Sequence, residues 1–370
     1  MREALRAIAL PFVASRAIVL ALLILFGNLE LVRTSYGFVK ETRITLHSAP
    51  LRNVFVTGDA EWYRSIAEDG YSRAPYRDGT QTNVAFFPLF PLLVRYLGIL
   101  PGYALDAVLL TQLFFFGALL LLYRLARAAG YDEEVARRTL GYAAFFPTSY
   151  FFSLPVAESL FVLLAAGCCV AAFADRWWLA GLLGAAASAT RLQGVLLVAF
   201  LIVLCWQRRR GWFSILLVPC GLAAFCLFLW RITGHPFAFV DSQSAWQRSA
   251  GLSMSQFTDF FRELPIVSAE WNFRALNFLM LLLLAAAAWM LWRKGQAALA
   301  AFVVASFAVV LLSGSLQSIG RYVLSTFPVF LALASIGGSR RTHEVVQCAL
   351  AVLLGALTVL YALHYDLAMT

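Results

Sequence analysis

The sequence predicts an all-α protein that crosses a membrane many times. Of its 370 residues, 61% are hydrophobic and only 13% are charged. Apolar runs of roughly 15 to 25 residues recur along the whole chain, and about 20 apolar residues span a bilayer as a helix. This composition excludes a water-soluble domain. We therefore expect a single integral membrane domain over residues 1–370.

The apolar runs define about eleven spans. The first run follows Arg2 and Arg6 in the sequence and has no small-residue cleavage site before Asn28. We interpret it as a retained signal anchor rather than a removed signal peptide. The expected spans are residues 8–27, 103–123, 139–154, 156–174, 177–189, 192–206, 212–231, 273–292, 297–312, 319–337 and 344–364.

Basic residues predict the orientation of these spans, because short cytoplasmic loops are enriched in Lys and Arg. With a cytoplasmic N-terminus, every short basic loop falls on the cytoplasmic side, so topology explains the net charge of +9 without a nucleic-acid partner. Residues 28–102 and 232–272 then form two long outer loops. The 27 arginines and two lysines among the 29 basic residues are typical of a GC-rich prokaryotic gene, which predicts a prokaryotic cell membrane.

The first outer loop contains the stretch "TGDAEWYRSIAEDGY", residues 57–71. It predicts a short amphipathic helix with Asp59 as its N-cap and Glu61 in the first turn. Trp62 and Tyr63 suit the membrane interface. Residues 83–100 contain two prolines and predict a bent segment in the outer leaflet. Together these segments are expected to form a lid on the membrane surface.

Charges inside apolar runs are costly in lipid and mark a cavity or a partner. Asp106, Glu158, Arg191 and Arg321 all fall near the outer ends of their expected spans, on the same side as Asp59. The sequence therefore predicts one outer cavity, lined by opposite charges, beneath the amphipathic helix. The short runs on either side of Arg191 predict a tight hairpin with that residue at its tip.

The predicted outer cavity suits a reaction that uses a lipid-linked donor, since nucleotide sugars and ATP are cytoplasmic. Arginine binds phosphate bidentately and remains charged, so it could hold a lipid phosphate and stabilise it as it leaves. Asp59 could accept the proton of an attacking hydroxyl.

Six stretches of the sequence, in this order, resemble the PIG-V family: "GDAEWYRSIAEDGY", "AFFPLFPLL", "PTSYFFSLPVAESLFVLL", "SATRLQGVLL", "GHPFAFVDSQSAWQR" and "GRYVLSTFPVF". The eukaryotic member of that family is the second mannosyltransferase of GPI-anchor synthesis. The resemblance implies the GT-C glycosyltransferase fold. It also implies transfer of mannose, with inversion and without a metal or other cofactor, from a polyprenyl-phosphate donor to an acceptor on the non-cytoplasmic face.

The resemblance carries over to individual positions. Asp59 matches the presumed catalytic aspartate, although Gly58 replaces the tryptophan that precedes it in the family. Glu158 matches a family glutamate, with Ala157 in place of a serine, and Arg191 matches the arginine of the small-residue hairpin. The departure at position 58 removes the stacking contact that a tryptophan would offer.

Gln243, Trp246 and Arg248 match a pattern of bacterial relatives. The candidate set then consists of Asp59 as general base; Arg191, Arg321, Arg64 and Arg248 for the donor phosphate; and Glu61, Trp62, Tyr63, Asn83, Glu158, Gln243, Trp246 and His235 for substrate. The expected partners are the polyprenyl-linked donor, a lipid or glycan acceptor and membrane lipid.

Each candidate also has a structural interpretation. Asp59 alone could be no more than a helix cap. Glu158 could form a purely structural ion pair with Arg191 or with Arg321. Arg16, in the inner half of the first span, is expected to snorkel to the membrane surface.

A metal site at Asp59 and Glu61 is a further alternative, because the pair mimics the D-x-D motif of some glycosyltransferases. Residues i and i+2 of a helix point apart, however, which disfavours a shared ligand. His235 precedes a proline and fits a hydrogen-bonding role in a loop.

Two other functions stay open at this point. One is a transporter or flippase of a polyprenyl-linked glycan, which would also need an outer cavity with arginines. A carrier is expected to place ionisable residues at mid-membrane and often to show repeated halves, and neither is apparent in the sequence. The other is a different GT-C transferase that uses another polyprenyl-linked sugar.

Overall fold

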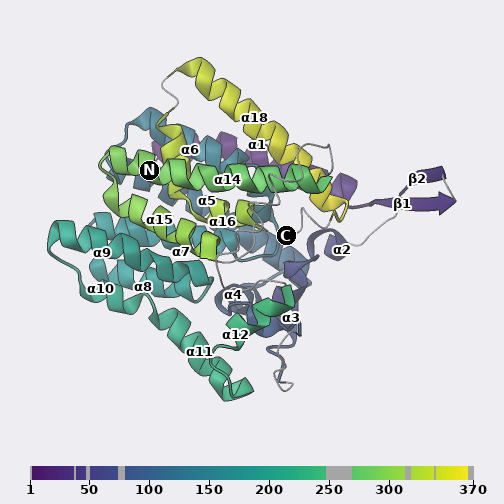
Figure 1. Cartoon of the computed structure of the whole chain (residues 1–370), viewed down its shortest axis with the longest axis horizontal. Helices are drawn as coiled ribbons and strands as arrows, with labels where there is room; N and C mark the ends of the chain where they lie inside the picture. Colours follow the sequence, from purple (N-terminus) through teal and green to yellow (C-terminus); the bar gives the residue numbers. More distant parts are fainter. Residues whose placement is uncertain are drawn as a thin grey trace.

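The computed structural model describes residues 2–36, 39–46, 51–73, 80–246, 269–312, 318–336 and 339–365. Most of this part of the chain is helical, and the longer helices pack side by side in one bundle (Figure 1). The helices of the bundle are α1 (Arg2–Phe26), α5 (Tyr103–Ala128), α6 (Glu133–Phe145), α7 (Glu158–Phe173), α8 (Trp177–Ser188), α9 (Leu197–Arg208), α10 (Phe213–Leu217), α11 (Cys220–Thr233), α14 (Ala269–Arg293), α15 (Ala297–Leu312), α16 (Ile319–Ser325), α17 (Pro328–Ala334) and α18 (Arg340–Ala362).

Helical structure coincides with each predicted span, and the membrane class is confirmed. Within the described ranges, four apolar helices or helix pairs of 10–17 residues accompany five longer ones, while the count of eleven spans stays a prediction. The segments long and apolar enough to cross a membrane are Glu3–Phe26, Tyr103–Ala128, Phe213–Thr233, Ala275–Arg293 and Arg340–Ala362.

Prolines interrupt three of the predicted spans. The run 139–154 ends as an α-helix at Phe145, just before Pro147, and continues as the 3₁₀ helix η2 (Ser149–Ser153). The run 212–231 divides at Pro219 into α10 and α11. The run 319–337 divides into α16 and α17, and Pro328 opens the second of them. Proline lacks an amide hydrogen and so breaks the helical ladder, which leaves backbone acceptors in the interior that other groups must satisfy.

Arg16 supplies donors to the first of these breaks, so the expectation that it snorkels is wrong. Its side chain is buried, and its guanidinium donates to the Ser149 carbonyl at 2.8 Å and hydroxyl at 2.6 Å. It also donates to the Ser153 hydroxyl at 2.9 Å and the Ala144 carbonyl at 3.0 Å. Its cationic carbon lies 4.7 Å from the centre of the Phe115 ring. The acceptors freed by the helix break hold the arginine inside the bundle.

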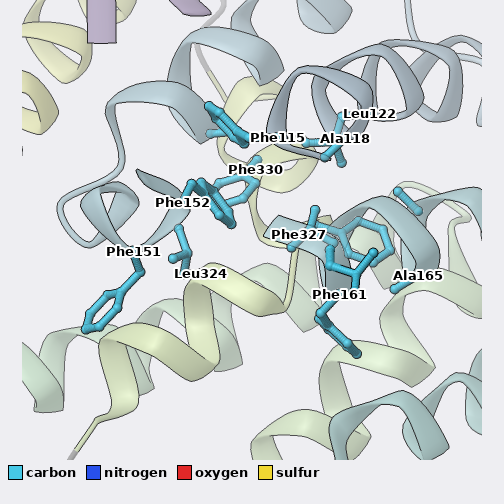
Figure 2. Close-up of a cluster of buried hydrophobic side chains, with 14 of the residues drawn as sticks. Phe115, Ala118, Leu122, Phe151, Phe152, Phe161, Ala165, Leu324, Phe327 and Phe330 are labelled. Carbon is cyan, nitrogen blue, oxygen red and sulfur yellow. The ribbon is translucent and has the colours of Figure 1, made fainter. Parts of the chain in front are cut away.

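An aromatic core joins the elements that carry the site (Figure 2). Phe115 of α5 stacks on Phe152 of η2 with ring centres 4.4 Å apart, and Phe327 and Phe330 extend the cluster from the α16–α17 segment. Helix α7 packs against α5 and α8 and is buried along most of its length. This packing fixes where α7 begins, which is at Glu158.

The segment predicted as the first outer loop, residues 28–102, contains a β-hairpin that the all-α prediction missed. Strands β1 (Leu29–Tyr36) and β2 (Val39–Leu46) pair antiparallel, with Leu29 opposite Leu46 and Tyr36 opposite Val39. The hairpin extends away from the bundle (Figure 1). Its segments are rich in β-branched residues, which favour strands, and no helical period of apolar residues competes with them.

The rest of this loop follows the prediction more closely. Residues 51–55 form α2 (Leu51–Phe55), and the amphipathic stretch forms α3 (Asp59–Glu68), which buries Tyr63 and Ile66 on one face. The proline-containing segment bends as expected into η1 (Asn83–Ala85) and α4 (Leu89–Leu97). Helix α3 packs on α4, where the Tyr63 ring meets Phe90 edge-on at 5.4 Å.

The second outer loop is described up to residue 246, and then again from residue 269 at the start of α14. It forms α12 (Ala238–Asp241) and the 3₁₀ helix η4 (Ser242–Trp246). Helix α12 contacts η1, so the two outer loops meet.

Candidate active site

Four charged side chains from distant parts of the sequence meet between α3, α7, α16 and the α8–α9 turn. Arg321 lies between two carboxylates: its Nε and Nη2 donate to Oε1 of Glu158 at 2.9 and 2.6 Å, and its Nη1 donates to Oδ2 of Asp59. Arg191 donates from Nη1 to the same Glu158 oxygen. The four side chains form an alternating chain of acids and bases, which we call the charge cluster.

Close backbone packing places Arg321. A Cβ at Gly320 would lie 2.7 Å from Cγ2 of Thr148, so only glycine fits this approach without a shift. The Thr148 hydroxyl donates to the Gly320 carbonyl at 2.9 Å. The ring of Phe151, from η2, lies 4.4 Å from the guanidinium carbon and adds a cation–π contact. The break after α6 therefore helps to orient the arginine of α16.

A second close approach places Arg191. A Cβ at Gly194 would lie 2.3 Å from the backbone nitrogen of Ser188, at the end of α8. The chain therefore turns tightly into the 3₁₀ helix η3 (Leu192–Leu196), as the predicted hairpin requires. Arg191 precedes η3 in extended backbone conformation.

Burial decreases along the charge cluster from the interior outward. The exposed fraction of the side chain is 0% for Glu158, 9% for Arg321, 15% for Arg191 and 29% for Asp59. Two carboxylates oppose two guanidinium groups, so the buried charges are neutralised, as burial of ions requires. Asp59 is the member most open to an incoming molecule.

Asp59, Arg191 and Arg321 line a cavity of about 390 Å³. A size of this order, mostly apolar walls and a few converging polar groups are typical of a small-molecule site. Apolar residues at Leu192, Val240 and Leu312 line the cavity and are also exposed on the surface of the protein. The other lining residues are Tyr63, Ala85, Phe86, Phe87, Thr190, Phe239, Gln243, Val309, Ser318 and Tyr322.

The expectation that Asp59 caps α3 is wrong. The cap position is Gly58, which has φ of 56° and makes no side-chain cap bond, and Asp59 is the first helical residue. Its carboxylate reaches Arg321 instead. Positive φ favours glycine, which gives a conformational reason for Gly58 at this position.

Other candidates on α3 lie outside the cavity lining or behind it. Arg64 pairs with Glu61 at 2.8 Å and with Glu68 at 2.6 Å along its own helix. The ring of Trp62 stacks on Phe86 with centres 6.0 Å apart, so it supports a residue of the cavity wall. The Asp59 and Glu61 carboxylates bind different arginines, and no group of three or more metal-ligating side chains occurs within the described ranges.

Asn83 links η1 to the end of α3. Its Oδ1 accepts the backbone hydrogen of Ser72 at 2.9 Å, and its Nδ2 donates to the Gly70 carbonyl at 3.0 Å and the Ser65 hydroxyl at 3.2 Å. The side chain is buried. These bonds assign Asn83 a supporting place behind the cavity.

Candidates from the second outer loop divide in the same way. Gln243 lines the cavity, whereas His235 is exposed and lies 3.2 Å from the Asp241 carboxylate. The backbone of Trp246 belongs to η4, but its side chain is outside the described part, and Arg248 lies wholly outside the described residues.

Tyr63 and Asp106 have distinct surroundings. Burial, and then the negative charge of Glu158, raise the pKa of Tyr63, so the phenol remains neutral where it lines the cavity. Asp106, expected in the same cavity, instead accepts the backbone hydrogens of Ile99 and Leu100 at 2.7 Å each. It holds the loop before α5 and lies outside the charge cluster.

The residues missed from the sequence are mostly aromatic. Phe86, Phe87, Phe239 and Tyr322 line the cavity, and Phe151 covers one face of Arg321. Each lies inside a quoted motif, so its place in the motif was the available signal. Aromatic residues are common throughout this chain, and sequence position alone did not distinguish these five.

Comparisons with known proteins show likeness at the level of structure. No protein-family model matches the sequence, and no curated protein does. The oligosaccharyltransferase of Archaeoglobus fulgidus tethered to an acceptor peptide is 14% identical, with a TM-score of 0.48, over 97% of this chain and 54% of that one. The apo form of the same enzyme is 12% identical, with a TM-score of 0.46, over 96% of this chain and 55% of that one. ArnT from Cupriavidus metallidurans in the apo state is 15% identical, with a TM-score of 0.44, over 91% of this chain and 61% of that one.

The likeness to these three structures is at 12% to 15% sequence identity. The chain spans between 54% and 61% of their lengths. At TM-scores below 0.5 the likeness establishes neither a family nor an activity, and PIG-V membership stays a prediction from the motifs. The function has to be inferred from the site itself.

Proposed function

We propose that this protein is a membrane glycosyltransferase that moves a sugar from a polyprenyl-phosphate carrier to an acceptor hydroxyl. The observation that carries the proposal is the partly exposed Asp59 carboxylate, held beside two arginines in one cavity. A base and cations next to the same cavity are what transfer from a phosphate leaving group requires.

In the proposed reaction, Asp59 accepts the proton of the acceptor hydroxyl. The acceptor oxygen attacks the anomeric carbon, and the bond from that carbon to the phosphate oxygen breaks. The bonding electron pair goes to the phosphate, whose charge changes by one negative unit. Attack from the face opposite the phosphate inverts the anomeric configuration.

The charge cluster supports this step electrostatically. Asp59 and Glu158 balance Arg191 and Arg321 before the reaction, so the cluster is formally neutral. Protonation of Asp59 leaves one positive charge uncompensated while the departing phosphate becomes more negative. Because Arg321 binds Asp59 directly, the two charge changes occur in contact with one network. A preorganised cation stabilises the charge of the transition state most strongly in a cavity that excludes water.

The apolar rim supports a lipid-linked donor. Leu192, Val240 and Leu312 line the cavity and are exposed at the protein surface. In a membrane protein, exposed aliphatic side chains suit contact with hydrocarbon. A polyprenyl chain could therefore leave the cavity over this rim while its phosphate stays at the arginines.

The sugar, the acceptor and the membrane face are proposed from the sequence. The PIG-V motifs favour mannose, a lipid-linked or other hydroxyl acceptor and the non-cytoplasmic face. We propose no metal for the reaction, because Asp59 and Glu61 engage different arginines. No feature of the site favours a carrier over a transferase.

The test uses purified protein in liposomes with radiolabelled polyprenyl-phosphate-mannose and a membrane lipid extract. We expect label in a new product and release of polyprenyl phosphate, with no transfer from GDP-mannose added alone. Polyprenyl-phosphate-glucose in a parallel reaction tests the sugar. Movement of intact donor between leaflets without turnover would identify a carrier and contradict the proposal.

A further inference from the structure

We propose that the two arginines of the charge cluster have different tasks: Arg191 binds the donor phosphate, and Arg321 is a positioning residue that holds Asp59 and Glu158. This inference rests on the proposed function. It follows from how the donors of each guanidinium are used.

Three of the five donors of Arg321 bind carboxylates of the protein. An arginine side chain has five N–H donors on three nitrogens. In Arg321, Nε and Nη2 bind Glu158 and Nη1 binds Asp59, so every nitrogen already has a carboxylate partner. The Phe151 ring covers one face of the guanidinium. Among the described residues, two N–H donors, one on each Nη, are left on Arg321, whereas a single bond to Glu158 leaves four on Arg191, so Arg191 offers a phosphate the larger set of donors.

The donors of Arg191 are used less. Within the described part of the chain its side chain makes one hydrogen bond, from Nη1 to Glu158. Arg191 lines the cavity, as do its neighbours Thr190 and Leu192. It is also more exposed than Arg321. Its remaining donors can form the planar fork that phosphate recognition uses.

The distribution of negative charge leads to the same assignment. Glu158 shares its Oε1 between both arginines, whereas Asp59 binds only Arg321 within the cluster. Arg191 therefore has half of one carboxylate as its counter-charge, and Arg321 has more. The electrostatic attraction of an incoming anion is strongest at the cation with less counter-charge, which is Arg191. Since it is fully buried, Glu158 orients both arginines without contacting substrate.

The two tasks give different kinetic signatures. Loss of a phosphate ligand weakens binding of a phosphate-bearing lipid and leaves binding of the corresponding alcohol unchanged. Loss of a residue that positions the base leaves lipid binding in place and lowers turnover. If either arginine had a purely structural role, its loss would lower the stability of the protein. Binding of the two lipids would then change equally or not at all.

The experiment measures binding of a short-chain polyprenyl phosphate and of the polyprenol of the same chain length to purified protein. We expect Arg191→Gln to weaken phosphate binding about tenfold to a hundredfold, and to leave polyprenol binding unchanged. Unchanged polyprenol binding also demonstrates that the variant is folded. Arg208→Gln removes an arginine from a surface ion pair with Asp175 and serves as the matched control.

Arg321→Lys keeps the charge and removes the fork. We expect it to retain the preference for the phosphate within about threefold and to lower kcat at least about tenfold at unchanged donor KM. If Arg191→Gln keeps the full preference and Arg321→Lys loses it, the assignment is overturned while the proposed function stands. If the wild-type protein binds phosphate and alcohol equally, the lipid-phosphate donor is contradicted, and the inference fails with it.

Discussion

Asp59 and Arg321 form an ion pair across 262 positions of the sequence. The pair joins α3, in the first outer loop, to α16 near the end of the chain. A second contact lies beside it, between the hydroxyls of Thr57 and Tyr361 at 2.8 Å. The position of the proposed base thus depends on how α3 docks on the bundle.

Glu158→Gln tests the buried centre of the charge cluster. The change removes, at a fully buried position, the anion that Arg191 and Arg321 share. We expect a loss of about 3 kcal/mol or more in the free energy of unfolding, measured by thermal melting in detergent. Glu344→Gln, which breaks an exposed pair with Arg340, should leave the free energy of unfolding nearly unchanged. Equal stability of the two variants would show that the cluster contributes little to folding.

Arg16→Lys distinguishes a buried guanidinium from a snorkelling one. Lysine cannot reproduce the bonds to Ser149, Ser153 and Ala144. Left unsatisfied, these buried acceptors should reduce stability by about 1–3 kcal/mol. The exposed Arg231 provides the control as Arg231→Lys. If Arg16→Lys melts at the same temperature as the wild type, the result would indicate that the Arg16 side chain lies at the membrane surface and contradict its burial.

Asn83→Ala should loosen the end of α3. The lost bonds are those to Ser65, Gly70 and Ser72, and each is worth about 0.5–1.5 kcal/mol. Hydrogen exchange of the amides over residues 65–72 should become about tenfold faster or more. Exchange at the wild-type rate would mean that the packing of α3 on α4 holds the segment without Asn83.

Leu312→Asn tests the apolar rim of the cavity. If a polyprenyl chain leaves the cavity there, KM should rise for a long-chain donor and change little for a short-chain one. An effect of about tenfold or more is expected, because burying this side chain against hydrocarbon is worth about 1.5–3 kcal/mol and about 1.4 kcal/mol is a factor of ten. Leu216→Asn alters a leucine that is also exposed but does not line the cavity. Equal KM changes for both chain lengths would contradict the route over Leu312.

Local features of the fold could be predicted from the sequence. The amphipathic helix at residues 59–68 and the bend around Pro88 follow from periodicity and proline chemistry, which act over a few residues. The membrane class follows from composition. The hairpin at 29–46 was missed, because the chain was interpreted as apolar helices and connecting loops.

Features that depend on contacts between distant segments could not be predicted to the same depth. Charges near the ends of the expected spans predicted a shared cavity for Glu158, Arg191 and Arg321, but not that one oxygen of Glu158 binds both arginines. The role of Gly320 depends on Thr148, which is 172 positions away. The residue types around Asp59 predict a helix cap. The carboxylate instead binds Arg321, a contact that the neighbouring residues do not indicate.

The most direct test of the account compares Asp59→Asn with Asp175→Asn in the liposome transfer assay. Both changes remove the charge of an aspartate paired with an arginine, but Asp59 lines the cavity and Asp175 lies in a surface ion pair with Arg208. Donor binding is measured alongside, so that a folded but inactive protein is recognised.

For Asp59→Asn we expect donor binding to persist and transfer to fall at least about a hundredfold, the contribution of general base catalysis. Asp175→Asn should match the wild type, since asparagine tolerates the positive φ of 57° at that position. Transfer by Asp59→Asn at the rate of Asp175→Asn would contradict the account, because the carboxylate would then serve only to hold α3 on Arg321.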